Sequence, residues 1–427
     1  RDCYVSVTAN NRLTLLSKNI IAARYNRVND GSVTPDALEV SERDASSQSF
    51  FKDPSLSKRF ASRPIVVLGD VGVGKTSFFE NLFFQVEDEL ALDAYFLHIN
   101  LGEKASLTQD LRSFIINDII RTLNNEYRVD IDDHDFVVSI YHNELTSFDK
   151  SPTGRLRTID PEQYELRRID FLNKKIDNRA AHLVAALAHL CHGRNKQIII
   201  VLDNADQRNF ETQQATFLIA QELSAAGSSL VFVALRPSTF FESKKRGALS
   251  GYQNKIFSIF PPPADEVIQR RLMFAIRVAE GKQGIDSLEG IRLQLDGIVL
   301  FLRSTLRSIK QNEQIQIFLN NITGGNTRTI IELVTSFFGS PNVDSEKIIK
   351  IEGQSGKYLV PLHEFTKHAL LGEYSYYNPN SSLYACNVFD IFTADSREHF
   401  LKSIIISFLA SNMGNKNKDG FVEGAAI

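Results

Sequence analysis

One short segment constrains this chain more than any other: the run Gly-Asp-Val-Gly-Val-Gly-Lys-Thr at residues 69–76. The apolar run Ile65–Leu68 precedes it and is typical of a buried strand, whereas Ser77–Phe83 follows it and is typical of a helix. A strand, a G-x-x-x-x-G-K-T loop and a helix form a cradle in which backbone N–H groups face a phosphate. The predicted phosphate-binding residues are Gly69, Asp70, Val71, Gly72, Val73, Gly74, Lys75, Thr76 and Ser77.

Two side chains of this loop carry the chemistry expected of such a cradle. Lys75 can reach the β- and γ-phosphates of a nucleotide, and the hydroxyl of Thr76 can bind Mg²⁺. The sequence therefore predicts ATP and Mg²⁺ as cofactors, with Lys75 in a catalytic role. No N-K-x-D run typical of guanine recognition stands out, which favours ATP over GTP.

Short apolar runs alternate with longer helical stretches from residue 65 onward. Nearly continuous Val, Ile and Leu runs are expected of parallel strands buried on both faces, and the intervening helices imply right-handed crossovers. The pattern predicts an α/β fold, a three-layer core with a parallel sheet. The five expected strands are Ile65–Leu68, Tyr95–Ile99, Ile198–Leu202, Leu230–Leu235 and Ile256–Ile259.

The third run ends in Asp203, whose carboxylate is predicted to bind, through water, the magnesium that Thr76 also holds. Asn204 follows, at a position where many ATPases carry a catalytic glutamate. An amide cannot accept a proton from water. Either Asp206 is the catalytic base, or hydrolysis is slow.

Basic residues near the ends of the later strands leave two interpretations open. Arg236 follows the fourth run, where it either senses the γ-phosphate in a catalytic role or pairs with a surface carboxylate. Lys244, Lys245 and Arg246 precede the fifth run. They are either solvated or supply Arg246 as an arginine finger to a neighbouring subunit.

After Pro261–Pro263 the apolar spacing becomes that of helices. The expected helices are 265–280, 291–308, 314–321, 327–338 and 358–371. Gly324 and Gly325 are expected to end one helix and Asn326 to cap the next. Arg328 then lies in a first helical turn, where a cation opposes the helix dipole, so the alternatives are a bound phosphate or plain helix punctuation.

Together these residues resemble a STAND-type signalling NTPase, a relative of the origin-recognition-like AAA+ ATPases. The resemblance covers about residues 60–340, with Thr327 standing where the familiar lid motif Gly-Gly-Asn-Pro-Arg has proline. It is carried by the loop at 69–76, by Val201-Leu202-Asp203-Asn204, by Arg236, and by Gly-Gly-Asn-x-Arg at 324–328.

This resemblance implies a slowly hydrolysing ATP switch that forms a homo-oligomer and controls an effector or sensor domain outside these residues. Many bacterial antiviral defence proteins have this layout, and a helical lid would place Arg328 at the phosphates. The alternatives are a replication-initiator-like DNA-binding ATPase and a nucleotide-binding scaffold with little hydrolysis. A P-loop kinase fits least, since no site for a second substrate is evident.

The expected domains are an N-terminal helix and linker at 1–60, the nucleotide-binding core at 61–263, a helical lid at 264–340, and a helical extension at 341–427. The resemblance implies that this extension begins a winged helix, with a first helix at 398–409 and a second element opening near Gly420. The chain begins with Arg1 rather than Met, and this half-finished winged helix stops at Ile427. We therefore expect both ends to be cropped from a longer protein.

Composition excludes several other classes. No apolar run approaches the roughly 20 residues of a membrane span. Three widely separated cysteines argue against a disulfide framework or a zinc site and fit a reducing cytoplasm. The acidic run at 130–135 lacks the glycine and terminal glutamate of a calcium loop, so we interpret it as a solvated turn. A net charge of −3 argues against a general nucleic-acid coat. The basic residues of 143–178 form either a solvated face or a local surface for a ligand or nucleic acid.

Overall fold

The computed structural model describes two compact units, the first ending at Pro262 and the second beginning at Pro263. The described residues are 3–7, 63–90, 94–102, 111–205, 209–225, 227–246, 255–282, 296–324, 326–379, 382, 384, 385, 387, 388 and 400–411. Most of residues 1–60, where an N-terminal helix and linker are expected, lie outside these ranges.

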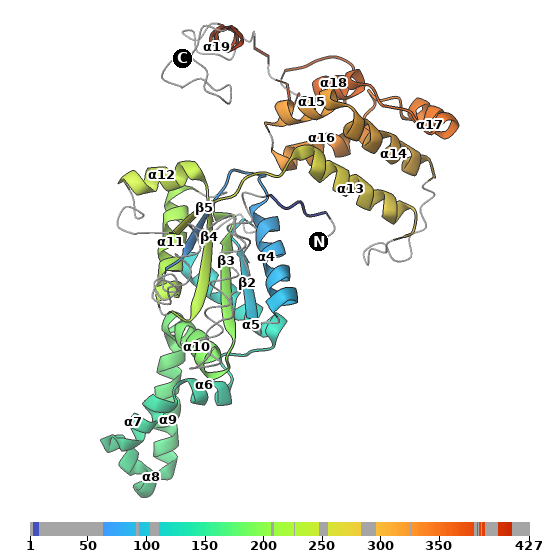
Figure 1. Ribbon diagram of the computed structural model, residues 1–427. Helices are drawn as coiled ribbons and strands as arrows, with labels where there is room; N and C mark the ends of the chain where they lie inside the picture. Colours follow the sequence, from blue (N-terminus) through green and yellow to red (C-terminus); the bar gives the residue numbers. More distant parts are fainter. Residues whose placement is uncertain are drawn as a thin grey trace, which may run out of the picture. The chain divides into compact units, whose positions relative to one another are not determined.

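A five-stranded parallel sheet forms the centre of the first unit (Figure 1). The strands lie in the order β2-β3-β4-β1-β5, so two strands separate β1 from β2 although they follow each other in the chain. Their bounds are β1 Ile65–Leu68, β2 Ala94–Asn100, β3 Gln197–Asp203, β4 Ser229–Leu235 and β5 Lys255–Ser258. All five agree with the predicted runs to within two residues at either end.

Helices cover both faces of this sheet, which confirms the predicted three-layer α/β class. Helix α4 (Lys75–Leu90) packs through Phe78, Phe79 and Leu82 on the face formed by Val67 and its neighbours. Helices α5 (Leu111–Tyr127), α10 (Arg179–Gly193) and α11 (Phe210–Ala225) pack on the opposite face. Figure 1 shows α4 and α11 on opposite sides of the sheet. Strand residues alternate between the two cores, as the two-residue period of a strand requires.

The connection from β1 to β2 runs in one direction along the sheet over the α4 face. Those from β2 through β3 to β4 run the other way over the opposite face. Reversing both the direction and the face keeps every crossover right-handed. The reversal falls between the neighbouring strands β1 and β4, and such switch points are where open α/β sheets bind ligands, beyond the carboxyl ends of the strands.

A helical insertion lies between α5 and α10. It comprises α6 (His134–Ile140), α7 (His142–Lys150), a 3₁₀ turn η2 (Pro152–Arg155), α8 (Leu156–Ile159) and α9 (Pro161–Asp177). Figure 1 shows α7 to α9 extending beyond the sheet, at the end opposite α12 (Pro237–Arg246). Residues 143–178 carry seven basic and seven acidic side chains, so the basic character expected there is balanced.

The second unit is helical in every element described. It comprises α13 (Ala264–Ala279), α14 (Asp296–Gln311), α15 (Glu313–Thr323), α16 (Thr327–Gly339), α17 (Ser345–Ser355), α18 (Leu362–Leu371) and α19 (Leu401–Ala410). Helix α17 was not expected from the sequence, and α18 begins four residues later than predicted, because residues 356–361 connect the two. Phe301, Phe337 and Phe365 lie at the centre of its core, where the last two rings stack with centroids 4.3 Å apart.

Helix α19 overlaps the helix expected at 398–409 from Leu401 onward, while the segment opening near Gly420 lies outside the described residues. The winged helix therefore stays a prediction. Across the described ranges, every helix is too short or too polar to cross a bilayer.

Candidate nucleotide-binding site

The loop at 69–74 lies at the carboxyl end of β1, at the switch point of the sheet. The N–H of Gly69 donates to the carbonyl oxygen of Leu235 at the end of β4, with 3.2 Å between nitrogen and oxygen. Helix α4 begins at Lys75, directly after the loop. The N-terminus of that helix therefore follows directly on the loop, and the N–H groups and partial positive charge of a helix N-terminus favour a bound anion.

The glycines give the loop its shape. Gly72 and Gly74 have φ angles of 80° and 92°, in the left-handed region that side chains disfavour. At Gly69, the close approach of other atoms leaves no room for a side chain. A Cβ there would lie 2.7 Å from Cγ2 of Val73 and 3.3 Å from Cγ of Lys75.

We expect Gly69→Ala to displace Val73 and Lys75 and to weaken nucleotide binding, because the new methyl group occupies the space that their side chains use. The matched control is Gly339→Ala, at the end of α16, where a Cβ would meet nothing within 4 Å. Calorimetric titration with ATP in Mg²⁺ measures the effect. Equal affinity in the Gly69 variant and the wild type would contradict this account of the loop.

Lys75 is buried, although its side chain is charged. Its ammonium donates to the carbonyl oxygens of Gly69 at 2.8 Å and Asp70 at 3.0 Å. These bonds hold the ammonium against the concave side of the loop. A buried ammonium needs several acceptors, and phosphate oxygens are strong ones.

Thr76 and Asp203 join the loop to the end of β3. The Thr76 hydroxyl donates to Oδ2 of Asp203 at 2.5 Å, across 127 positions in the sequence. With its hydrogen directed to the carboxylate, the hydroxyl oxygen keeps lone pairs available for a cation. The structure thus brings together the two side chains that separate motifs assign to the metal, and their role in binding it stays a prediction.

Asp203 is completely buried and accepts several hydrogen bonds. The backbone N–H of Asn204 donates to Oδ1 at 2.8 Å, and Nε2 of His98 lies 3.3 Å from Oδ2. Burial by itself raises the pKa of Asp203. The hydrogen bonds from His98, Thr76 and Asn204 outweigh that effect, so the pKa lies below its ordinary value. The carboxylate is therefore ionised at neutral pH.

Two polar residues of β2 belong to the site and were not expected from the sequence. His98 contacts Asp203, and Oδ1 of Asn100 accepts from Nδ2 of Asn204 at 2.8 Å and from the N–H of Gly102 at 3.0 Å. In the sequence, the polar residues at 98 and 100 interrupt an otherwise apolar strand on one face. This pattern points to a site only once β2 is known to lie beside β3. Asn204 itself has a φ of 57°, a conformation that asparagine tolerates better than most residues.

The other predicted site residues are placed as follows. Arg236 is half-buried at the end of β4, one position beyond the residue that contacts Gly69. Asp206 lies outside the described residues. Arg246 is the last residue of α12, and Asp70, Val71 and Ser77 are exposed.

Arg328 belongs to the second unit, where it is exposed in the first turn of α16. Asn326 caps this helix as expected, accepting from the N–H groups of Arg328 at 3.0 Å and Thr329 at 3.2 Å. Gly324 ends α15, also as expected.

The donors at Thr76 and Asp203 fit Mg²⁺, which prefers oxygen ligands. Among the described residues there is no group of three or more His, Cys, Asp or Glu side chains that could hold a metal by themselves. In sites that use phosphate oxygens as further ligands, Mg²⁺ commonly needs only one or two protein ligands. The acidic turn at 130–135 has structural partners, since Asp133 caps α6 and Asp132 pairs with Arg179.

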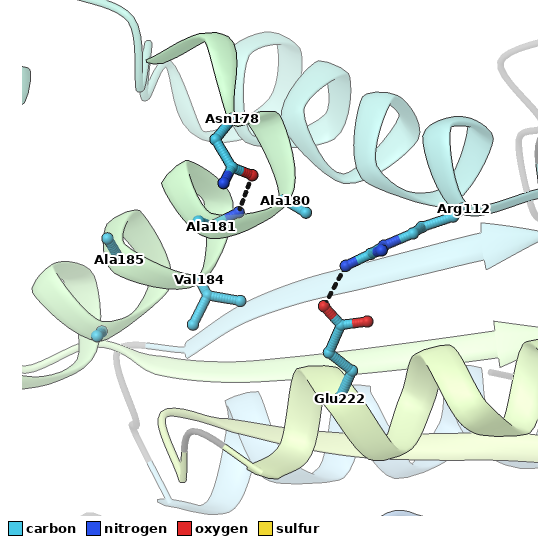
Figure 2. A pocket seen from close by; sticks show the side chains of 8 residues that line it. Arg112, Asn178, Ala180, Ala181, Val184, Ala185 and Glu222 are labelled. Carbon is cyan, nitrogen blue, oxygen red and sulfur yellow. Dashed lines mark hydrogen bonds and ion pairs between the residues drawn. The ribbon is translucent and has the colours of Figure 1, made fainter. Parts of the chain in front are cut away.

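A separate cavity of about 570 Å³ lies on the face of the sheet opposite α4 (Figure 2). Small residues of α10 form much of its wall: Ala180, Ala181, Val184, Ala185 and Ala188. An ion pair between Arg112 and Glu222 closes one side. None of the predicted nucleotide-site residues lines it, and it offers no group of the kind that binds phosphate beyond this paired arginine.

Comparisons with known proteins leave the family open. No protein-family model matches the sequence, and no curated protein matches it. Among solved structures, the chain is similar to Cdc6p from Pyrobaculum aerophilum, with 16% identity and a TM-score of 0.34, over 90% of this chain and 77% of that one. A similarity of that size is too weak to assign a function. The site geometry itself shows a glycine-rich loop joined by a hydrogen bond to a buried carboxylate, at the carboxyl ends of the strands of a parallel α/β core.

Proposed function

We propose that this chain binds ATP with Mg²⁺ at the loop 69–76 and hydrolyses it slowly. The observation that carries the proposal is the 2.5 Å hydrogen bond from Thr76 to the buried, ionised Asp203, directly beside the loop. In this proposal Lys75 binds the β- and γ-phosphates, Thr76 and Asp203 hold the metal, and Arg236 senses the γ-phosphate. Bound Mg²⁺ would neutralise charge on the phosphates during transfer to water.

Slow hydrolysis follows from Asn204, whose amide cannot act as a general base. Its Nδ2 donates to Oδ1 of Asn100, and its amide oxygen can accept a hydrogen bond but is too weak a base to take a proton from water. Asp206 is the alternative base. Asp206→Ala tests that role directly: turnover equal to the wild type would remove Asp206 from the chemistry.

Asn204→Glu is expected to raise ATP turnover about tenfold or more, because a positioned general base contributes roughly 10²- to 10⁴-fold. The gain is expected at the low end, since glutamate fits the φ of 57° less well than asparagine does. Asn204→Gln, which adds the same length without a base, is the matched control. Release of phosphate under saturating ATP and Mg²⁺ measures the change, and equal turnover in the two variants would contradict the role given to Asn204.

We further propose that nucleotide binding drives assembly into a homo-oligomer that controls an effector or sensor domain, as in antiviral defence ATPases. Arg246 would act as an arginine finger in the neighbouring subunit, and Arg328 would couple the helical second unit to the phosphates. Particle size measured by light scattering with ATP and Mg²⁺, beside turnover, tests the switch. A protein that neither bound ATP nor changed its particle size when ATP was added would contradict the switch.

A replication-initiator-like DNA-binding ATPase is the second candidate, because a strand-and-helix core followed by a helical unit suits that class as well. It requires duplex DNA affinity that falls steeply as salt rises. Fluorescence anisotropy with labelled duplex DNA at two salt concentrations separates the candidates.

A further inference from the structure

His98 is the residue of the site that the phosphate-binding motif does not explain. It lies on β2, where the aligned positions of β2 and β3 place it beside Val201, two residues before Asp203. Its Nε2 is 3.3 Å from Oδ2 of Asp203, the same oxygen that accepts from Thr76. The side chain is 29% exposed, so most of the ring is enclosed by protein.

Aromatic packing fixes the orientation of this ring. Phe96 and His98 are two positions apart on β2 and so lie on the same face of the sheet, the face that α4 covers. Their rings are nearly parallel, with centroids 6.4 Å apart and an interplanar angle of 16°. Phe96 in turn stacks on Phe83 of α4 at 4.1 Å. A stack of three rings therefore runs from the helix that begins at Lys75 to the carboxylate at the end of β3.

The direction of the hydrogen bond follows from the acceptor. Both oxygens of Asp203 already accept hydrogen bonds, Oδ1 from the N–H of Asn204 and Oδ2 from the hydroxyl of Thr76, so the carboxylate acts as the acceptor. Nε2 of His98 must therefore carry a hydrogen, which is true of both the neutral Nε2–H tautomer and the imidazolium. The bond does not depend on whether the ring is charged.

Three groups contact the Asp203 carboxylate, and only one of them is also a proposed metal ligand. The Thr76 hydroxyl is shared, since its oxygen is also a proposed ligand of the metal. His98 and the backbone N–H of Asn204 serve the carboxylate alone, one on each oxygen. Together these two can hold the plane of the buried carboxylate. Partners of this kind, which hold a metal-binding group without touching the metal, typically affect metal affinity 10- to 100-fold when removed.

We propose that His98 is a positioning residue for the metal: through Nε2–H it holds Asp203 in the orientation that binds the Mg²⁺ of the bound nucleotide. This inference rests on the proposed function and assigns a role to a strand that carries no nucleotide-binding motif. In this proposal the stacked rings of Phe83 and Phe96 hold the His98 ring in the orientation that contacts the carboxylate.

The test measures metal dependence rather than turnover. The full chain is titrated with ATP by calorimetry at increasing free Mg²⁺, for the wild type, His98→Ala and His98→Gln. Binding of Mn²⁺ in the presence of ATP, followed by electron paramagnetic resonance, reports the metal directly. The matched control is His189→Ala, which removes another partly buried ring, packed edge-on against Phe136 at 5.3 Å on the other face of the sheet.

For His98→Ala we expect the metal concentration at half-saturation to rise about 10- to 100-fold, with ATP affinity in EDTA unchanged within about twofold. His98→Gln, which keeps an N–H donor at similar reach, is expected to recover most of the loss, and His189→Ala to leave metal dependence unchanged. Unchanged metal dependence in His98→Ala would overturn the inference, and so would a Gln variant as impaired as Ala. A wild type that bound no ATP would overturn the proposed function together with this inference.

Discussion

Lys75→Ala should reduce ATP affinity about 10- to 100-fold and abolish measurable turnover. A hydrogen bond to a charged group contributes about 1.5–3 kcal/mol, and each 1.4 kcal/mol is a factor of ten. The buried ammonium contacts two backbone carbonyl groups of the loop, so its loss also removes a positive charge from the proposed phosphate site. Calorimetric titration with ATP in Mg²⁺ measures the affinity.

The matched control for that variant is Lys174→Ala, which removes the same charge from an exposed position on α9. Its ATP affinity is expected to equal that of the wild type. If Lys75→Ala bound ATP as tightly as Lys174→Ala, the loop at 69–76 would not be the nucleotide site.

Asp203→Asn should remove the metal dependence of nucleotide binding and reduce turnover roughly 100-fold. Loss of a residue that only supports a metal ligand typically lowers activity about 10- to 100-fold, and we expect the upper end of that range here. The substitution keeps the shape of the side chain but removes its negative charge. An amide in that place also turns an NH₂ group toward one of the donors that now bind the carboxylate. That mismatch is expected to cost about 1–3 kcal/mol in the free energy of unfolding.

Thermal unfolding and calorimetry at several Mg²⁺ concentrations separate these two effects of Asp203→Asn. Asp132→Asn is the control, because it removes another carboxylate with a lowered pKa, one that pairs with Arg179 far from the loop in sequence. Asp132→Asn should leave the metal dependence intact. A wild-type response to Mg²⁺ in Asp203→Asn would remove this carboxylate from the metal site.

The parts of this site that could be predicted are those that neighbouring residues in the sequence define by themselves. Gly69 to Thr76 form one continuous motif between a strand and a helix, so spacing alone indicates a phosphate cradle. Asp203 could be predicted because an apolar run leads directly to it. The strands could be predicted because residues buried on both faces leave nearly uninterrupted Val, Ile and Leu runs.

His98 and Asn100 could not be predicted, because their roles depend on partners more than 100 positions away. Only the neighbouring positions of β2 and β3 bring Asn100 beside Asp203 and His98 within reach of its carboxylate. Helix α17 was missed for a different reason. Its buried face is narrow, with only Ile348 and Glu352 fully buried, so it lacks the apolar stripe that marks a helix in a sequence.

The central claim is that the loop and the buried carboxylate form one ATP·Mg²⁺ site. The most direct measurement is a calorimetric titration of the wild-type chain with ATP, once in Mg²⁺ and once in EDTA, which needs no intrinsic probe in a chain without tryptophan. We predict one ATP bound per chain, with affinity at least about tenfold higher in Mg²⁺ than in EDTA. Absence of binding in Mg²⁺, or equal affinity in Mg²⁺ and EDTA, would contradict the account.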